Sequence, residues 1–198
     1  MARLQSGQEI ERTLRALGEL LDASDSQPIG LLVCGGASLI VTKLVARSTR
    51  DVDVLTFFGP ERPEQSDLRR HDALPPPLKE AASTVAADFG LDSDWLNFGP
   101  TGLVQLGLPD GLMARAIRRD YGQKLRVFYI SRLDQIHLKL YAATGGEERH
   151  FQDLRALNPT ADELRQAKEW IETNLADAVL PSEVEAIVED LGCERLHD

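Results

Sequence analysis

The chain has few cysteines and lacks long apolar runs, and both absences narrow its class. Cys34 and Cys193 are its two cysteines among 198 residues. Cys34 lies in an apolar segment and Cys193 lies near the C-terminus, so we expect neither a structural disulfide nor a cysteine metal site. No apolar run approaches the ~20 residues that cross a bilayer, and the first residues show no signal-peptide pattern. We therefore expect a cytoplasmic protein with no membrane partner.

Patterns for several common active sites are also missing. The four histidines show no metal-type spacing, and no Ser-His-Asp or Cys-His set can be recognised. Internal repeats and low-complexity tracts are absent from the sequence as well. Its 42% apolar and 27% charged residues are ordinary for a globular protein. The length allows one substantial core, with or without a small helical appendage.

The net charge of −10 is concentrated in one part of the chain. Residues 147–198 hold 14 acidic and 5 basic residues, and the remainder is nearly neutral. Within that remainder, residues 115–139 have a local basic excess, which could meet phosphates or could be a solvated helix face and hairpin. We do not expect a broad nucleic-acid-binding surface. The acidic C-terminal segment could dock a basic partner.

Apolar periodicity and breaker residues predict the elements of the first 130 residues. Gln27-Pro28 and Gly59-Pro60 separate the first of them, and a loop rich in proline and charge is expected over 60–77. The predicted helices are 7–23, 37–46, 77–89 and 112–119, and the predicted strands are 29–34, 52–58, 103–108 and 124–130.

The rest of the chain has a purely helical pattern. Helices are predicted over 131–143, 147–156, 160–176 and 181–192, and the second pair begins at a capping-box pattern, Thr160 to Glu163. Ser131 and Asp134 resemble a capping box too. The order of elements predicts an α+β fold, with a mixed sheet and flanking helices over 1–130 and a C-terminal helical region over 131–198 packed on that core. Two arrangements of residues 160–198 stay open: they form a separate lobe, or they close over the functional site.

Two aspartates at the start of one predicted strand carry the first chemical signal. Side chains alternate along a strand, so Asp51 and Asp53 project to one side, while Val52 and Val54 project to an apolar side. Two carboxylates on one face repel unless a cation lies between them, and oxygen ligands suit Mg²⁺ with substrate phosphates. A Mg²⁺ pair could align a nucleophile and an α-phosphate for in-line displacement. A solvent-facing edge strand is the alternative for so short a motif.

A Gly-Gly turn before these aspartates carries the second signal. Gly35 and Gly36 follow an apolar strand and precede a helix, so backbone amides could approach a phosphate closely there. Ser38, in the first helical turn, could donate to the same phosphate. A plain strand-to-helix turn is the alternative. The order is the more specific feature: apolar strand, Gly-Gly, helix, basic residue, then Asp-x-Asp between valines.

Together these segments resemble a known signature. Residues 34–40 (CGGASLI) and 47–54 (RSTRDVDV) resemble the motif of the polymerase-beta-like nucleotidyltransferase superfamily. The Arg-x-Thr-x-Asp-x-Asp form is most similar to its bacterial abortive-infection, toxin-like branch and to related proteins of unknown function. Residues 130–142 resemble the helix of that family that bears a lysine beside the site, and 149–154 resemble the helix start that follows. Residues 94–97 also resemble a segment of the unknown-function members.

The resemblance, which covers about residues 29–58 and 124–157, implies a role for each matched position. The implied phosphate-binding residues, to which we add a neighbouring cation, are Gly35, Gly36, Ser38 and Arg50. Asp51 and Asp53 would bind Mg²⁺ and act in catalysis with Lys139 and Asp153. Lys139 would neutralise phosphate charge, and Asp153 would act as an accessory acid or orient Lys139. A lysine that snorkels from a helix and a solvated helix aspartate are the alternatives.

One departure from the family pattern keeps two functions open. Many members take a third metal carboxylate from the next strand, but the predicted strands 103–108 and 124–130 carry no acid. Gln105 and Asp110 are candidates for a counterpart of this third carboxylate at a displaced position. The leading hypothesis is a Mg²⁺-dependent nucleotidyltransferase that moves a nucleoside monophosphate from an NTP to a hydroxyl acceptor.

In the toxin-like branch that acceptor can be tRNA, and an antitoxin restrains the enzyme. The competing hypothesis is a catalytically silent nucleotide-binding or protein-interaction module. A chance match within an ordinary α+β domain is the third.

Overall fold

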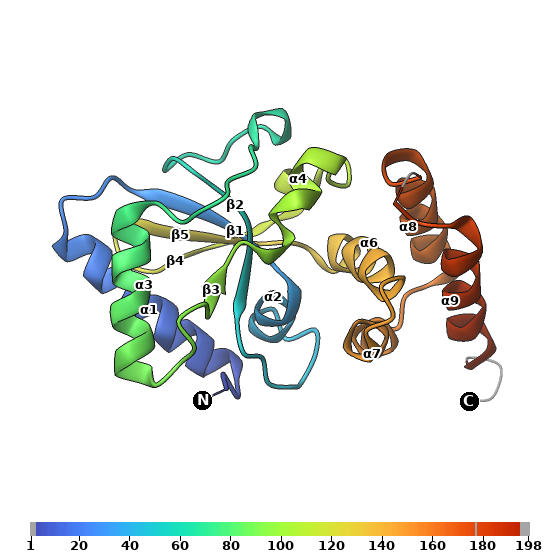
Figure 1. Ribbon diagram of the computed structural model, residues 1–198, viewed down its shortest axis with the longest axis horizontal. Helices are drawn as coiled ribbons and strands as arrows, with labels where there is room; N and C mark the ends of the chain where they lie inside the picture. Colours follow the sequence, from blue (N-terminus) through green and yellow to red (C-terminus); the bar gives the residue numbers. More distant parts are fainter. Residues whose placement is uncertain (1–2, 177, 195–198) are drawn as a thin grey trace. The chain divides into compact units, whose positions relative to one another are not determined.

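The fold is α+β, as the sequence predicts, and it divides into two compact units. The computed structural model describes residues 3–176 and 178–194. The first unit is Met1–Ser131 and contains a mixed sheet with helices, whereas the second unit is Arg132–Asp198 and is helical over its described residues (Figure 1).

A five-stranded sheet in the order β3-β2-β1-β5-β4 forms the centre of the first unit. β1 pairs antiparallel with β2 and parallel with β5, while β2 and β3 are parallel and β4 and β5 antiparallel. The strands are β1 (Ile29–Cys34), β2 (Val52–Phe58), β3 (Leu96–Asn97), β4 (Ile117–Asp120) and β5 (Leu125–Tyr129).

Three helices cover one side of this sheet, and the loop between β2 and α3 lies on the other (Figure 1). They are α1 (Gly7–Ala23), α2 (Gly35–Val41) and α3 (Pro76–Phe89). α1 begins where the Ser6 side chain accepts a hydrogen bond from the backbone N–H of Glu9. Its apolar stripe is fully buried and fits the predicted amphipathic helix: Ile10, Leu14, Leu17 and Leu21.

The alternation along β2 separates an apolar face from the face that bears the aspartate. Val52 and Val54 are fully buried in the same core cluster as the apolar residues of α1 and α3. Asp53 lies between them in sequence and therefore projects to the opposite face of the strand. The predicted division of the valines and Asp53 between the two faces is thus present in the fold, whereas Asp51 precedes β2 and is not part of its alternation.

The second unit consists of α6 (Arg132–Ala143), α7 (Glu148–Leu157), α8 (Ala161–Asn174) and α9 (Pro181–Glu194). α6 packs against α7 and α8, and α9 packs against α6 and α8. The capping box predicted at the start of α8 is present, because Thr160 Oγ1 accepts from the Glu163 N–H and the Glu163 carboxylate accepts from the Thr160 N–H.

Four predicted elements differ from the fold. Residues 103–108, predicted as a strand, follow a 3₁₀ turn (η2, Gly99–Gly102) and form the short helix α4 (Leu103–Leu106). Gly107 ends this helix with a φ of 105°, and a run of six residues is too short for periodicity to distinguish strand from helix. Helix 112–119 is shortened to α5 (Leu112–Arg115), because the residues that follow pair with β5 as the edge strand β4.

The predicted helix 37–46 instead spans Gly35–Val41, and the predicted loop 60–77 ends where α3 begins at Pro76. That loop contains a 3₁₀ turn, η1 (Gln65–Asp67). β3 was not predicted, because two residues give no periodic signal.

No helix among residues 3–176 and 178–194 is both long and apolar enough to span a bilayer.

Candidate functional site

The centre of the candidate site is the contact between Asp53 and Gly35. β1 and β2 pair with Cys34 opposite Asp53, after an irregularity in register between Leu32 and Val33. Gly35 follows directly with a φ of 66°, which glycine adopts readily and other residues do not. A β-carbon at Gly35 would overlap Asp53 Oδ2. The absence of a side chain at Gly35 therefore lets the carboxylate lie against the turn that was predicted to bind phosphate.

Asp51 is held next to this turn by Thr49. Thr49 Oγ1 donates to Asp51 Oδ1 at 3.1 Å, and the Thr49 backbone pairs with Leu4 through two hydrogen bonds of 2.9 and 3.0 Å. The pairing with Leu4 in the N-terminal segment fixes the position of Thr49, which in turn orients Asp51. Asp51 and Asp53 are both half-buried, so their oxygens combine a defined position with partial access to solvent.

Arg47 brings a positive charge to the same turn. A β-carbon at Gly36 would lie 2.9 and 3.1 Å from the two terminal nitrogens of Arg47 and 2.8 Å from Thr49 Oγ1. The Arg47 guanidinium also donates to the Ser48 carbonyl oxygen at 2.8 Å. Arg47 belongs to the predicted motif, but no role was predicted for it. Its position next to Gly36 is a tertiary contact that spacing alone does not reveal.

Ser38 and Arg50, two predicted phosphate ligands, lie in different environments. The Ser38 side chain is fully buried, and its Oγ has no hydrogen-bond partner among the described residues. A buried hydroxyl without a partner costs about 1–3 kcal/mol, so a ligand that supplies an acceptor would be stabilised there. Arg50 is exposed to solvent. Both assignments stay predictions.

The position next to Asp53 on the neighbouring strand is an amide, not an acid. β3 pairs with β2 so that Asn97 is opposite Asp53, and paired residues of adjacent strands share a face. Asn97 Oδ1 accepts from the Gly99 N–H at 2.7 Å. Of the two predicted strands on which a third acid was expected, 103–108 is not a strand, because Leu103–Leu106 is helical, and 124–130 contains β5, which carries no acid. Within the described residues, no three His, Cys, Asp or Glu side chains gather as a metal group.

The residues present fit Mg²⁺ shared with a phosphate better than a closed protein cage. Mg²⁺ in nucleotide enzymes is commonly held by one or two carboxylates together with substrate phosphates and water. Asp51 and Asp53 supply two such oxygen donors, and the missing side chain at Gly35 lets the Asp53 carboxylate lie against the turn. The unpartnered Ser38 hydroxyl is a further polar group that a phosphate could satisfy.

A pocket of about 710 Å³ borders the site on the side of Arg47. Its lining comes from the segment around Ser6, from the end of α2 and from the loop that follows, and it includes the cations Lys43 and Arg47. A volume of this size is within the ~300–1,000 Å³ range of small-ligand pockets.

The second unit holds the two other predicted catalytic residues as a buried ion pair. Lys139 Nζ on α6 lies 2.7 Å from Asp153 Oδ2 on α7, and both side chains are buried. This pairing favours the orienting role for Asp153, because its carboxylate contacts the Lys139 ammonium directly. Lys139 is not a snorkelling lysine, and Asp153 is not solvated, so both alternatives for these residues are wrong.

Several cations of the basic stretch 115–139 are used within the fold. Arg118 bonds to Asp120 at 2.7 Å, Arg119 pairs with Glu11, and Arg132 pairs with Glu163. Lys124 Nζ donates to the Ser24 carbonyl oxygen. The hydrogen bond from Arg118 lowers the pKa of the Asp120 carboxyl. These pairings favour the interpretation of the stretch as a structural surface.

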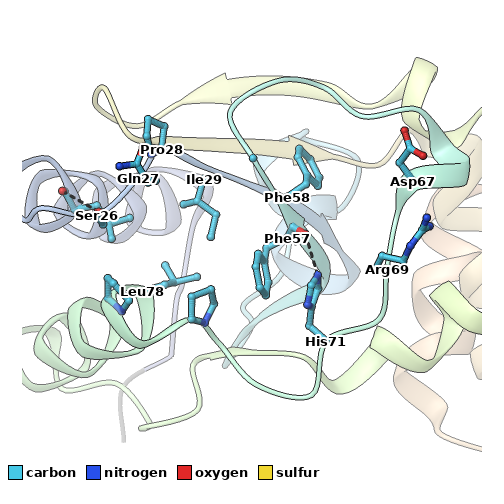
Figure 2. A pocket seen from close by; sticks show the side chains of 14 residues that line it. Ser26, Gln27, Pro28, Ile29, Phe57, Phe58, Asp67, Arg69, His71 and Leu78 are labelled. Carbon is cyan, nitrogen blue, oxygen red and sulfur yellow. Dashed lines mark hydrogen bonds between the residues drawn. The ribbon is translucent and has the colours of Figure 1, made fainter.

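A second pocket, of about 450 Å³, lies at the opposite end of β1 and β2 (Figure 2). Its wall includes Phe57 and His71, whose rings stack with centroids 3.7 Å apart. His71 Nε2 lies 3.1 Å from the Phe57 carbonyl oxygen, so this nitrogen carries the proton and donates. None of the predicted site residues lines this pocket, and no motif in the sequence points to it.

Comparisons with protein-family models, with curated proteins and with solved structures find no match to this chain.

Proposed function

We propose that this chain is a Mg²⁺-dependent nucleotidyltransferase of the polymerase-beta-like superfamily. It would move a nucleoside monophosphate from an NTP to a hydroxyl acceptor. The observation that supports this best is the packing of the Asp53 carboxylate against Gly35, with Asp51 held by Thr49 at 3.1 Å.

Each residue has a defined task in this proposal. The backbone N–H groups of the Gly35-Gly36 turn bind phosphate oxygens, and Arg47 adds positive charge there. Asp51 and Asp53 would hold Mg²⁺, which when bound neutralises phosphate charge and aligns the reacting groups. The roles that the resemblance implies for Lys139 and Asp153, in the second unit, stay predictions.

The proposed reaction is a substitution at the α-phosphorus. The acceptor oxygen forms a bond to this phosphorus while the bond to the bridging oxygen of the β-phosphate breaks, so pyrophosphate leaves. The acceptor hydroxyl loses its proton to solvent. The toxin-like resemblance makes tRNA the first acceptor to test, and an antitoxin the first protein partner.

The direct test incubates the purified chain with each α-labelled NTP, Mg²⁺ and total RNA. We expect label transfer by the wild type and a loss of about 10²-fold or more in Asp53→Asn, because that residue supports metal and phosphate together. Asp67→Asn is the matched control, since Asp67 is an exposed aspartate at the other end of β2. Equal activity of wild type and Asp53→Asn, or no transfer to any acceptor, contradicts the enzymatic proposal.

A second candidate is a nucleotide-binding module without turnover. The amide of Asn97 opposite Asp53 favours it, because many members of the superfamily have a third carboxylate on the next strand. Calorimetric titration with NTP and Mg²⁺ separates the two: binding without label transfer supports the module. Binding of neither NTP nor Mg²⁺ contradicts both candidates.

A further inference from the structure

The pocket of about 450 Å³ at the far end of β1 and β2 has no task in the proposed function. All of its lining residues belong to the first unit. It lies between the end of β2, the start of β1 and the start of α3 (Figure 2). Its volume is within the ~300–1,000 Å³ range of small-ligand pockets, and a ligand there would contact no residue of the glycine turn.

One wall of this pocket is the ring of Phe57, which is held in place from one side. His71 stacks on it with an interplanar angle of 23°, and His71 Nε2 donates to the Phe57 carbonyl oxygen at 3.1 Å. The ring of Phe98 lies at the edge of this stack, because its centroid is 5.9 Å from that of Phe57 and 6.3 Å from that of His71. Neither ring therefore covers the second face of Phe57.

The side of the pocket opposite Phe57 is aliphatic. Figure 2 shows Ile29 and Leu78 on the side of Phe57 that faces away from His71. Phe57 itself is half-buried. A cavity with an aromatic face on one side and aliphatic side chains on the other favours a planar ring, which stacks on the first and packs against the second.

The charges of the lining favour a ligand without charge. One acid and one base line the pocket, Asp67 and Arg69, and both are exposed, so neither sign dominates. The start of α3 is a poor anion site, because Pro76 and Pro77 at the first two helical positions have no N–H group.

We propose that this pocket binds an uncharged, planar aromatic molecule, which stacks on the open face of Phe57. Burial of the apolar surface of both partners stabilises the complex. The ring of Phe57 loses little conformational freedom on binding, because stacking with His71 fixes it before a ligand arrives. This is a ligand site separate from the nucleotide site, at the other end of the same two strands.

Three probes of similar size test the class of ligand. 2-Naphthol is planar and uncharged at pH 7, decahydro-2-naphthol is its saturated counterpart, and 2-naphthoate carries a negative charge. Titration of the wild-type chain with 2-naphthol, followed by amide NMR, is expected to show saturable shift changes at residues 26–29, 57–59 and 75–78 and none at residues 35–38. Decahydro-2-naphthol is expected to bind about three- to tenfold more weakly, because it cannot stack, and 2-naphthoate no more tightly than 2-naphthol.

A pair of variants tests the contact with Phe57. Phe57→Leu keeps an apolar side chain without the ring, so 2-naphthol is expected to bind about three- to tenfold more weakly and decahydro-2-naphthol within about twofold of the wild type. Phe89→Leu is the matched control, because Phe89 is also a half-buried phenylalanine packed against the core cluster but does not line the pocket. It should bind both probes as the wild type does.

Each contrary result overturns the proposal in a defined way. Without saturable binding of 2-naphthol to the wild type, the pocket is not a ligand site. Equal binding of 2-naphthol and its saturated counterpart means that the pocket does not select planar rings, and tighter binding of 2-naphthoate means that it selects an anion. Equal effects of Phe57→Leu and Phe89→Leu exclude stacking on Phe57.

The comparison of the three probes needs only the wild-type chain, so the proposal stays testable where Phe57→Leu fails to fold. None of these results changes the proposed function, because the probes and the nucleotide contact different residues.

Discussion

The Asp53 carboxylate occupies the space that a side chain at Gly35 would fill. Cys34, the residue before this glycine, is paired with Asp53 across β1 and β2, so the chain turns at the point where the carboxylate arrives. The left-handed φ of 66° at Gly35 directs the backbone into α2 at once. Gly35 thus meets two requirements that a residue with a side chain would not meet: the left-handed turn and the close approach of the Asp53 carboxylate.

Gly35→Ala is expected to destabilise the chain more than an ordinary left-handed glycine would. The left-handed conformation costs a side-chain-bearing residue about 1–2 kcal/mol, and displacement of Asp53 adds to this, for a total of about 2–4 kcal/mol. Gly90→Ala is the matched control, because Gly90 has a φ of 64° with nothing within 4 Å of its β-carbon position. Urea denaturation measures both free energies of unfolding. Equal losses in the two variants would show that the contact with Asp53 has no energetic weight.

Asn97→Asp is expected to convert the site into one that needs a cation. A third carboxylate opposite Asp53 adds repulsion of about 1 kcal/mol between like charges on neighbouring strands. Mg²⁺ should relieve it, so the thermal midpoint is expected to fall without Mg²⁺ and to recover when Mg²⁺ is added. Asn97→Ser removes the amide without adding charge and should show no such recovery. A thermal midpoint of Asn97→Asp that does not change with Mg²⁺ would argue against a cation between residue 97 and Asp53.

Asp153→Asn is expected to be strongly destabilising. Removal of one partner from a buried ion pair costs about 3–5 kcal/mol, because the other charge is left in the interior. The exposed pair Arg165–Glu169, at 2.7 Å, provides the contrast, and Glu169→Gln should cost no more than about 0.5 kcal/mol. Chemical denaturation at neutral pH measures the two changes. Similar losses at both sites are incompatible with a buried pair in the second unit.

The stability of the chain is expected to fall between pH 6.5 and pH 4 through His150. Burial and the positive charges of Lys139 and Arg149 lower its pKa from 6.5 to about 4 in the folded state, so the unfolded state binds a proton in this range and the folded state does not. The contribution of His150 to the free energy of unfolding is fully present above pH 6.5, declines as the pH falls, and levels off below about pH 4. Its size is about 1–3 kcal/mol.

His150→Asn cannot bind that proton, so the difference in unfolding free energy between wild type and variant should change with pH over this range. The slope is measured by denaturant titrations at several pH values, with Gln152→Ala as the control that keeps the wild-type slope. A difference that is constant from pH 7 to pH 4 contradicts the assignment of the lowered pKa to His150.

Much of the fold was predictable where the sequence carries a local signal. The apolar stripe of α1, the continuous apolar run of β1 and the Val-Asp-Val alternation of β2 each repeat with the period of their element. The Thr160–Glu163 capping box of α8 is a pattern within four residues and formed as predicted. In the candidate site, the division of Asp53 and its flanking valines between two faces follows from the same alternation.

The elements that were mispredicted depend on partners far away in the chain. β3 is two residues long and exists because it pairs with β2. β4 is an exposed edge strand whose pairing with β5 outweighs a helical pattern. For the same reason the third acid was expected on the predicted strands 103–108 or 124–130, whereas Asn97 is the residue that pairs opposite Asp53.

The sequence by itself determined which segments are helices and strands with strong periodicity, which face of β2 bears its carboxylate, and where glycine permits a turn. Only the tertiary structure decided that Asp53 touches Gly35, that Arg47 reaches Gly36, and that Lys139 is held between Asp153 and His150. The physical reason is the separation along the sequence of the residues that interact. Periodicity and capping arise from hydrogen bonds between residues a few positions apart, whereas these contacts depend on strand register and helix packing between separate segments.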